Sequence, residues 1–277
     1  MNENYLCRLF ELQAKTAVLT GGGGVLCSAM SKALAKAGAK VAVLDISLDA
    51  AQKVVADIQA EDGEALAVQC DVLNKNSIET AAQTILAKFG RVDILVNGAG
   101  GNKKEATTSP YLSFFDLPPD AVQWVFNLNF LGTLLPSQVF GKIMVEQGAG
   151  VILNISSMNA FQPLTRVPAY SAAKAAVSNF TQWLAVHMAQ EYSADIRVNA
   201  LAPGFFLTEQ NRFLLTNRED GGLTERGQKI IDNTPQGKFG SPEDLLGAMF
   251  WLLSPASQFV TGIVVPVDGG FSAFSGV

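Results

Sequence analysis

The chain has 277 residues and a mass of 29.4 kDa, of which 48% are hydrophobic and 16% charged, a balance that excludes a disordered protein. Its 25 acidic residues outnumber its 20 basic ones, for a formal net charge of -5. This sign is wrong for general polyanion binding, so we expect neither nucleic acid nor an anionic membrane as a partner. Cys7, Cys27 and Cys70 are scattered, and His187 is the single histidine, which argues against a metal site and for a reducing compartment.

The beginning of the chain, MNENYLCRLFEL, lacks the continuous apolar core of a secretory signal. The longest strongly apolar stretches, such as Leu245 to Leu253, are too short for a hydrocarbon layer that needs about 20 residues. We therefore predict a soluble, cytoplasmic protein.

Short β-branched runs alternate with longer Ala-rich segments that have helical spacing along the chain. Such alternation is typical of parallel strands joined by right-handed helical crossovers. No linker or repeat divides the sequence, so residues 1–277 are predicted to form a single α/β domain, a doubly wound parallel sheet with helices on both faces (Rossmann-type). The expected strands are 16–20, 41–45, 65–71, 93–100, 151–157, 196–203 and 262–270.

One long segment interrupts the alternation. Residues 205–240 are richer in polar side chains and carry Gly221, Gly222, Pro235 and Gly237. A connection of this length without a strand is usually a functional loop. We predict a substrate lid there.

A glycine-rich turn follows the first expected strand and leads directly into a helix. Glycines allow the backbone N–H groups and the positive end of the helix to approach a pyrophosphate. A permissive strand-to-helix turn would also explain such a run, but its place at the first turn of a doubly wound sheet favours a nucleotide site. The predicted cofactor-binding residues of this turn are Gly21, Gly23, Gly24, Val25 and Leu26.

Asp45 ends the second expected strand and is followed by Ile46, without an adjacent Arg or Lys. A carboxylate here can accept hydrogen bonds from the adenosine ribose and repels a 2′-phosphate, which favours NAD over NADP. The alternative is that Asp45 only caps the next helix.

Further polar or small residues stand at the ends of the third and fourth expected strands. They are Asp71 and Val72 after the third, and Asn97, Gly98 and Ala99 after the fourth. Ligands bind at the carboxyl ends of parallel strands, so we predict that these residues also contact the cofactor. Ordinary turn chemistry is the alternative for each of them.

Ser157 ends the fifth expected strand, and Tyr170 and Lys174 stand four residues apart in the helix after it. That spacing places the phenol and the ammonium on one helix face. A nearby ammonium lowers the pKa of a phenol, which would make Tyr170 a usable acid or base. Alone, such a pair could be a surface contact.

With these motifs together, the chain resembles the short-chain dehydrogenase/reductase superfamily from about residue 10 to its end. The resemblance implies that Ser157, Tyr170, Lys174 and Asn129 are catalytic: Tyr170 exchanges the proton, Ser157 binds the reacting oxygen, and Lys174 holds the nicotinamide ribose. Asn129 would support a water relay to Lys174. The resemblance also adds Tyr170, Lys174, Pro203, Gly204 and Thr208 to the cofactor-binding residues.

Two departures from the family's motifs matter. In the glycine turn, written TGxxxGxG, Val25 and Cys27 replace the second and third glycines, and in the motif written NNAG the second position is Gly98. A Cβ at Val25 and at Cys27 narrows the approach of the backbone to a phosphate and of the helix to the sheet. Cys27 could be a reactive thiol at a helix start or a small packing residue; we favour packing.

Within the superfamily, the sequence resembles the short-chain type of D-mannonate oxidoreductase, also called fructuronate reductase, and similar gluconate 5-dehydrogenases. The implied substrate is a hexuronate or aldonate. A sugar acid needs a cation for its carboxylate and amides for its hydroxyls. The candidates are Asn159, Arg166, Gln210 and Arg212, although each charged one could be a solvated loop residue.

His187 lies well past Tyr170 on the same expected helix, among apolar residues, so we predict a packing or interface role for it. The family resemblance implies a homotetramer. Two other functions stay open: a dehydrogenase of a neutral polyol or another ketose, and a nucleotide-binding sensor without catalysis. An intact Ser157, Tyr170 and Lys174 argues against the sensor.

Overall fold

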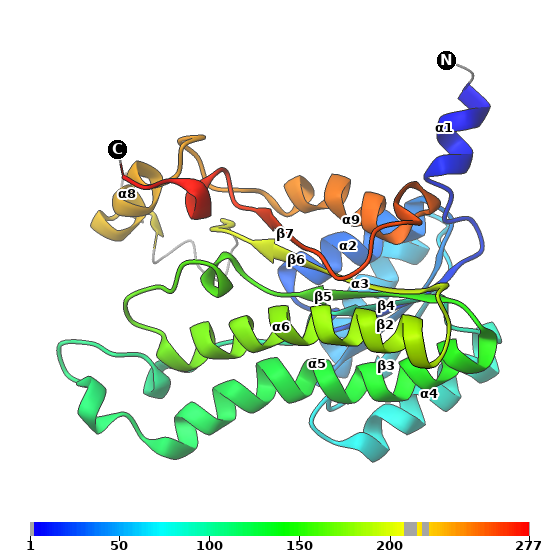
Figure 1. Cartoon of the computed structure of the whole chain (residues 1–277), viewed down its shortest axis with the longest axis horizontal. Coiled ribbons are helices and arrows are strands. Elements are labelled where there is room, and N and C mark those ends of the chain that lie inside the picture. The colour runs from blue at the N-terminus through cyan, green and yellow to red at the C-terminus, as the bar shows by residue number, and fades with distance from the viewer. Residues whose placement is uncertain (1–2, 208–214, 218–221, 277) are drawn as a thin grey trace.

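In the computed structural model, which describes residues 3–207, 215–217 and 222–276, the described strands form one parallel sheet in the order β3-β2-β1-β4-β5-β6-β7 (Figure 1). Leu19 lies opposite Val43 on one side and Val96 on the other. The predicted doubly wound α/β fold is confirmed. The strands are β1 (Thr16–Thr20), β2 (Lys40–Asp45), β3 (Ala65–Gln69), β4 (Ile94–Asn97), β5 (Gly150–Ile155), β6 (Ile196–Pro203) and β7 (Val264–Val267).

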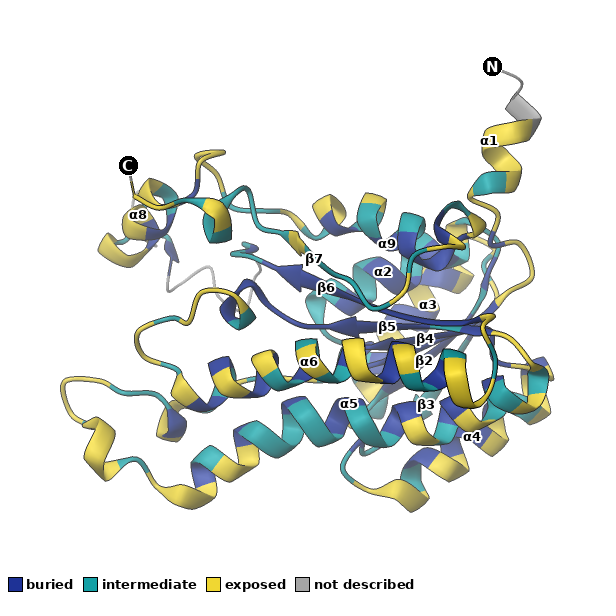
Figure 2. Cartoon of the chain, viewed as in Figure 1, coloured by how far each residue is buried: buried dark blue, intermediate teal, exposed yellow. Residues whose placement is uncertain are grey.

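Helices cover both faces of the sheet because successive strand residues point to opposite sides. Val41 and Val43 enter one buried cluster with α2, α3 and α9, whereas Ala42 and Leu44 enter the other with α4, α5 and α6. Figure 2 shows the strands as the buried centre. The helices are α1 (Glu3–Leu9), α2 (Val25–Lys36), α3 (Leu48–Gln59), α4 (Lys75–Phe89), α5 (Pro119–Gln147), α6 (Pro168–Glu191), α8 (Glu225–Asp232) and α9 (Leu246–Leu253).

Several expected strands were too long at their carboxyl ends. β3 stops at Gln69, before Asp71, and β4 stops at Asn97, before Gly98. β5 ends at Ile155, two residues before Ser157. At each place the backbone leaves the ladder to form the rim of the sheet, so these residues belong to the loops above it.

No helix in the described part of the chain has the length and apolar character needed to cross a membrane. Among the same residues, no group of three or more His, Cys, Asp or Glu side chains lies together as a metal site would require.

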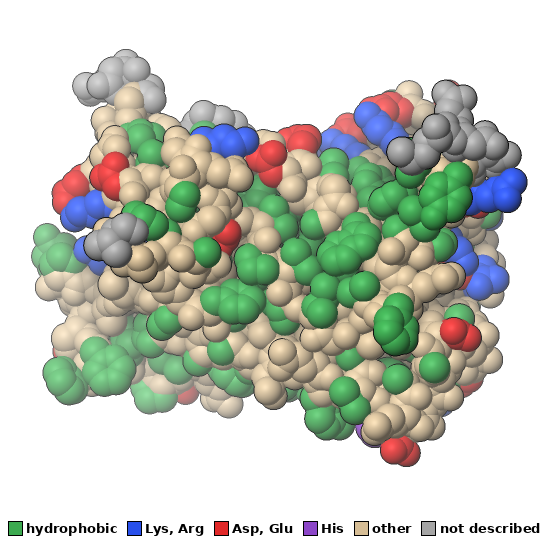
Figure 3. Space-filling view, turned by 45° about the horizontal axis from the view of Figure 1, so that its top comes forward, with side chains coloured by type: hydrophobic (Ala, Val, Ile, Leu, Met, Phe, Trp, Pro, Cys, Tyr) green, Lys and Arg blue, Asp and Glu red, His purple; other side chains and the backbone are tan. Residues whose placement is uncertain are grey.

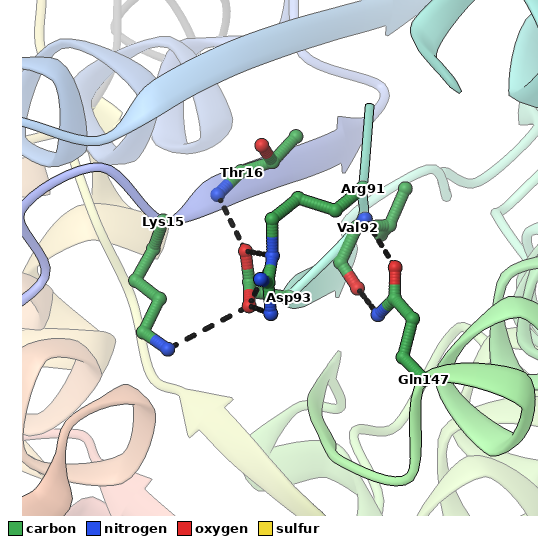
Figure 4. Close-up of polar contacts among 6 residues, drawn as sticks. All are labelled: Lys15, Thr16, Arg91, Val92, Asp93 and Gln147. Carbon is green, nitrogen blue, oxygen red and sulfur yellow. Dashed lines mark hydrogen bonds and ion pairs between the residues drawn. The ribbon is translucent and has the colours of Figure 1, made fainter. Parts of the chain in front are cut away.

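The buried carboxylate of Asp93 connects two strands at the amino ends of the sheet, opposite the rim (Figure 4). Asp93 accepts a hydrogen bond from the Thr16 backbone N–H at 3.0 Å and is bound by the Arg91 guanidinium, with Nη2 at 2.7 Å. Lys15 adds an ion pair at 3.6 Å. These contacts tie the start of β1 to the start of β4, at the end of the molecule away from the rim.

Asp93→Ala should lower the free energy of unfolding by about 1–3 kcal/mol, because the buried Thr16 N–H loses its acceptor. Urea denaturation measures the change. Arg91→Ala is the matched control: its side chain is 54% exposed against 8% for Asp93, so its loss should cost less than about 1 kcal/mol. Equal costs for the two variants would contradict this account.

Candidate active site

The glycine turn between β1 and α2 is closely packed against the rim. Gly21 has φ +62°, and a Cβ there would lie 2.8 Å from the Cα of Ala99. A Cβ at Gly23 would lie 2.6 Å from that of Ala50. The backbone therefore needs glycine at both positions, as the cofactor prediction assumed.

The turn also determines which N–H groups a ligand could use. Gly23 N donates to Asp45 Oδ2 at 3.0 Å, and Gly24 N donates to Gly21 O at 3.0 Å. Val25 and Leu26 open α2, where the first N–H groups have no intrahelical acceptor. The residues present thus fit a pyrophosphate placed at the start of α2. The backbone N–H groups of Val25 and Leu26 would bind it, and the positive end of the helix dipole would stabilise its charge.

Asp45 belongs to this turn and does not cap α3. Its Oδ1 accepts from Ser47 N at 3.0 Å, while the cap is Ser47, whose Oγ accepts from Ala50 N at 3.3 Å. The capping alternative is therefore wrong. The carboxylate spans the glycine turn and the start of α3, and exposed Ile46 stands beside it.

The departures from the family's glycine pattern compensate for each other in space. A Cβ at Gly98 would collide with Cys27 Sγ, but would lie 3.6 Å from Cys27 Cβ. The thiol thus fills the volume left by the missing side chain at Gly98. Burial raises the pKa of Cys27 to about 12, so the thiol stays protonated and unreactive at neutral pH. These contacts fit the packing interpretation.

Asn97 lies beneath the rim instead of on it. Its side chain is 1% exposed and donates to Ser137 Oγ at 2.9 Å and Asn154 Oδ1 at 2.8 Å. Asn154 in turn donates to Thr181 Oγ1 at 2.9 Å. This network joins β4, β5, α5 and α6, and any contact of Asn97 with a cofactor would come from its backbone.

The remaining cofactor candidates lie along the same rim. Asp71 Oδ1 accepts from Leu73 N at 2.9 Å, and Val72 packs against Gly132 of α5, where a Cβ would lie 3.1 Å from Val72 Cγ2. Gly204 N donates to Val267 O at 3.0 Å, which joins the loop after Pro203 to β7. Thr208 lies outside the described residues.

The structure brings Ser157, Tyr170 and Lys174 together above β5. The side chain of Tyr170 lies close enough to that of Ser157 for Ser157 to lower the pKa of the phenol. Lys174 is 4% exposed, its Nζ donates to Ile155 O at 2.7 Å, and that nitrogen lies 5.6 Å from the centroid of the Tyr170 ring. The strand end and the helix face therefore meet as the motif predicted.

The expected effect of Lys174 on Tyr170 is not found in this structure. Burial raises the pKa of Tyr170, and the hydrogen bond with Ser157 offsets only part of that rise. Burial also lowers the pKa of Lys174 to about 8. Because desolvation dominates both groups, Tyr170 is a neutral phenol near pH 7, ready to donate a proton.

Asn129 is fully buried on α5 and binds the loop after β4. Its Nδ2 donates to Gly101 O at 2.7 Å and to Val125 O at 2.8 Å, and its Oδ1 accepts from Gly101 N at 3.3 Å. A Cβ at Gly100 would lie 2.7 Å from Asn129 Oδ1 and 3.3 Å from Lys174 Nζ. Asn129 thus lies on the same side of this loop as Lys174.

A cavity of about 660 Å³ opens beside Tyr170. Two predicted substrate residues, Asn159 and Arg166, line it. Asn159 Oδ1 accepts from Leu164 N at 2.7 Å and from Ser171 Oγ at 3.3 Å, so its amide N–H₂ is the part left for a ligand. Gln210 and Arg212 lie outside the described residues.

Sequence reasoning missed the part of this cavity formed by α8 and the C-terminal tail. Phe205 and Phe271 meet edge to face at 5.1 Å, and both line the cavity, as do Glu225, Arg226, Lys229 and Asn233. The charges of α8 were the available signal, since they fall inside the predicted lid. His187 stacks on Trp183 at 4.7 Å and lines a different cavity, between α5 and α6.

A family model described as short chain dehydrogenase matches residues 15–219. An uncharacterized oxidoreductase of Bacillus subtilis (strain 168), UxuB, is 53% identical over 276 residues, which cover 96% of this chain and 98% of that protein. The 2-dehydro-3-deoxy-D-gluconate 5-dehydrogenase of Escherichia coli (strain K12) is 34% identical, with 95% of this chain and 98% of that protein covered.

Two solved structures share the fold. A Haemophilus influenzae protein with bound NAD, provisionally named a D-mannonate oxidoreductase, gives a TM-score of 0.91 at 49% identity, covering 96% of this chain and 98% of that one. A gluconate 5-dehydrogenase from Burkholderia cenocepacia J2315, in complex with NADP and tartrate, gives 0.86 at 29% identity, covering 97% and 99%.

The geometry and these similarities define an oxidoreductase that acts on CH–OH groups with a nucleotide cofactor. The chain belongs to the short-chain dehydrogenase family.

Gly98→Ala should lower the free energy of unfolding by about 1–3 kcal/mol through overpacking against Cys27 and weaken NAD binding. In the double variant Cys27→Ala/Gly98→Ala the collision with the thiol is gone and the two Cβ atoms would be 3.6 Å apart, whereas the contact of the new Cβ with Thr20 O at 3.0 Å remains, so part of the loss should be recovered. Thermal unfolding and calorimetric titration with NAD measure both effects.

Gly101→Ala is the matched control, because a Cβ there meets only Leu128 Cδ2, at 3.7 Å. It should be close to neutral in both measurements. Strict additivity of the Cys27 and Gly98 substitutions would show that the two positions are not coupled.

Proposed function

We propose that this protein is an NAD-dependent oxidoreductase that interconverts D-fructuronate and D-mannonate, or a closely similar hexuronate and aldonate. The observation that carries the proposal is the charge of the cavity beside Tyr170. Among the described residues, three cationic side chains and one carboxylate line it, on a chain whose formal net charge is -5. A cavity of this polarity suits an anionic sugar better than a neutral one.

The similarities give independent support. The Haemophilus influenzae structure at 49% identity bears the provisional name of D-mannonate oxidoreductase, and more distant relatives act on other sugar acids by name. For the lid, we propose residues 205–240, which include α8, within a single domain of 1–277.

In the proposed mechanism, the nicotinamide cofactor supplies or accepts the hydride when it is bound. Tyr170 donates its phenolic proton to the ketone oxygen during reduction and takes it back during oxidation. Ser157 donates a hydrogen bond to the same oxygen. Lys174 holds the nicotinamide ribose while Ile155 O fixes its Nζ. Asn129 fixes the loop after β4 and supports proton supply to Lys174.

NAD is the proposed cofactor. Asp45 places a carboxylate where the adenosine ribose of such a nucleotide would lie, and the glycine turn holds it there through Gly23. A 2′-phosphate would meet this negative charge. The Haemophilus influenzae structure contains NAD, whereas the gluconate 5-dehydrogenase relative contains NADP. The other residues of the proposed cofactor site are Gly21, Gly23, Gly24, Val25, Leu26, Ile46, Asp71, Val72, Asn97, Gly98, Ala99, Tyr170, Lys174, Pro203, Gly204 and Thr208.

Two other functions are weaker. A gluconate 5-dehydrogenase or a ketose or polyol dehydrogenase would use the same reaction chemistry, and the relatives at about one-third identity favour it. A neutral substrate would have no charged group to pair with the cationic side chains of the cavity. A catalytically inactive sensor would not require the joined Ser157, Tyr170 and Lys174.

A cytoplasmic homotetramer is the proposed state of the protein. An apolar cavity of about 450 Å³ lies between α5 and α6, and Trp183 on α6 is 57% exposed. Figure 3, turned by 45° from the view of Figure 1, shows apolar side chains across the middle of the surface, with most charged ones along its upper border and at its ends. Faces of this kind suit subunit contacts. The free thiols of Cys7, Cys27 and Cys70 suit a reducing compartment.

The deciding experiment is NADH oxidation by the purified protein, followed at about 340 nm, the absorbance of the reduced nicotinamide. The panel contains D-fructuronate, D-tagaturonate, 5-ketogluconate and D-fructose. D-fructuronate should have the highest kcat/KM. Tyr170→Phe is the control: it should lose about 100-fold or more in kcat, because the proton donor is gone, while its affinity for NAD changes little.

A preference for another keto acid would remove the specific substrate but leave the chemistry in place. Unchanged turnover by Tyr170→Phe would overturn the mechanism, and a preference for D-fructose would favour the neutral-ketose alternative.

The wild-type protein should use NADH better than NADPH, and Asp45→Asn should narrow that difference by about tenfold, because it removes the like charge that a 2′-phosphate meets. The ratio of kcat/KM for the two cofactors measures the effect. Ser47→Ala, which removes the true cap of α3, serves as the matched control and should leave the ratio unchanged. A wild-type preference for NADPH would contradict the assignment of Asp45.

A further inference from the structure

The cations beside Tyr170 come from two separate segments. Arg166 lies in the loop before α6, whereas Arg226 and Lys229 lie three residues apart on α8, a spacing that places their side chains on one helix face. Figure 1 shows α8 at the same end of the molecule as the start of α6. The cavity lies where these two segments meet.

α8 is fixed in place by contacts at Gly227 and Ile230. Ile230 is buried and itself lines the cavity, and Gly227 packs so closely on Leu215 that a Cβ there would lie 3.2 Å from the Leu215 carbonyl carbon. Thr224 caps the helix, its Oγ1 accepting from Gly227 N at 3.0 Å. A fixed helix holds its charged groups toward the cavity at a lower entropy cost than a free loop would.

Hydrogen bonds also connect the two ends of the predicted lid, residues 205–240, to each other. Leu207 N donates to Gly240 O at 3.0 Å, and Gly240 N donates to Phe205 O at 2.9 Å. The two ends of the predicted lid are thus paired beside β6. This pairing holds the two ends of the segment that carries α8 next to each other.

One carboxylate already lies among these cations. Glu225 Oε1 accepts from Lys229 Nζ at 2.7 Å, with the two side chains 86% and 73% exposed. The hydrogen bond and charge of Lys229 lower the pKa of Glu225, and the charge of Arg166 adds to this effect. An exposed ion pair of this kind contributes little to stability. Lys229 can therefore give up Glu225 and bind another carboxylate with little loss of free energy.

We propose that Arg226 and Lys229 on α8, with Arg166 opposite them, form the subsite for the substrate carboxylate, and that Glu225 occupies this subsite until the substrate displaces it. This inference rests on the proposed sugar-acid function and extends it to specific residues. Within the described part of the chain, Arg226 has no ion pair of its own. Arg226 is therefore the principal donor to the incoming carboxylate, because a guanidinium can bind it with two parallel hydrogen bonds.

The test compares D-fructuronate with D-fructose, which has a hydroxymethyl group in place of the carboxylate. Arg226→Gln should raise KM for D-fructuronate about tenfold to hundredfold, the range for a charge-assisted hydrogen bond, with kcat changed by less than about twofold. Its kcat/KM for D-fructose should stay at the wild-type value. Arg226→Lys should recover part of the loss.

Glu225→Gln should act in the opposite direction and lower KM for D-fructuronate, because the competing carboxylate is removed, again without effect on D-fructose. Lys53→Gln, a charge removed from the exposed face of α3, is the matched control for net charge and should leave both substrates unaffected. Calorimetric titration of the NAD-loaded protein with D-mannonate provides a second readout, in which Arg226→Gln should weaken binding by the same factor.

If the wild-type protein reduces D-fructuronate and Arg226→Gln keeps the wild-type ratio of acid to neutral substrate, the subsite is wrong and the proposed function stands. If the wild-type protein prefers D-fructose, both are overturned. If it reduces no member of the panel, the proposed function fails, and unchanged D-mannonate binding by Arg226→Gln would then overturn the subsite as well.

Discussion

The parallel direction of the described strands is the constraint on which the site depends. Because every strand runs the same way, every carboxyl end reaches one rim, and residues far apart in the sequence become neighbours there. The glycine turn follows β1, Asp45 ends β2, and Ser157 follows β5. Lys174 then joins α6 to this rim through its bond to Ile155 O. A strand antiparallel to the others would place its carboxyl end, and the polar residues that follow it, at the opposite end of the sheet.

Buried hydrogen bonds below the rim hold the elements that carry the reactive groups. Asn97, Asn154, Thr181 and Ser137 connect two strands with two helices. Asn129 does the same for α5 and the loop after β4. Polar groups this deep in a core are costly unless they are paired. Pairing of this kind restricts α5 and α6 to one arrangement, which fixes where Tyr170 and Lys174 stand.

Close packing explains how the cofactor turn tolerates an unusual sequence. The family pattern has glycine where this chain has Cys27, and the added thiol needs room. Gly98 provides it from the neighbouring strand end. Charge is also distributed unevenly along the rim: Asp45 places a negative charge beside the glycine turn, whereas Arg166, Arg226 and Lys229 line the cavity beside Tyr170. A mildly acidic chain thus carries a local cluster of cations next to its candidate active site.

The sequence by itself predicted the architecture and the candidate catalytic residues. Alternation of apolar runs with helical spacing is a local pattern, so it predicted the parallel sheet; the four-residue spacing of Tyr170 and Lys174 is local too. It did not predict where β3, β4 and β5 end, since the ladder stops where neighbouring strands diverge. Nor did it predict that Cys27 meets Gly98, or that burial outweighs Lys174 in setting the pKa of Tyr170. Only the tertiary structure decided these, and with them the position of Arg226 and Lys229 in the cavity, because each depends on atoms brought together from distant segments.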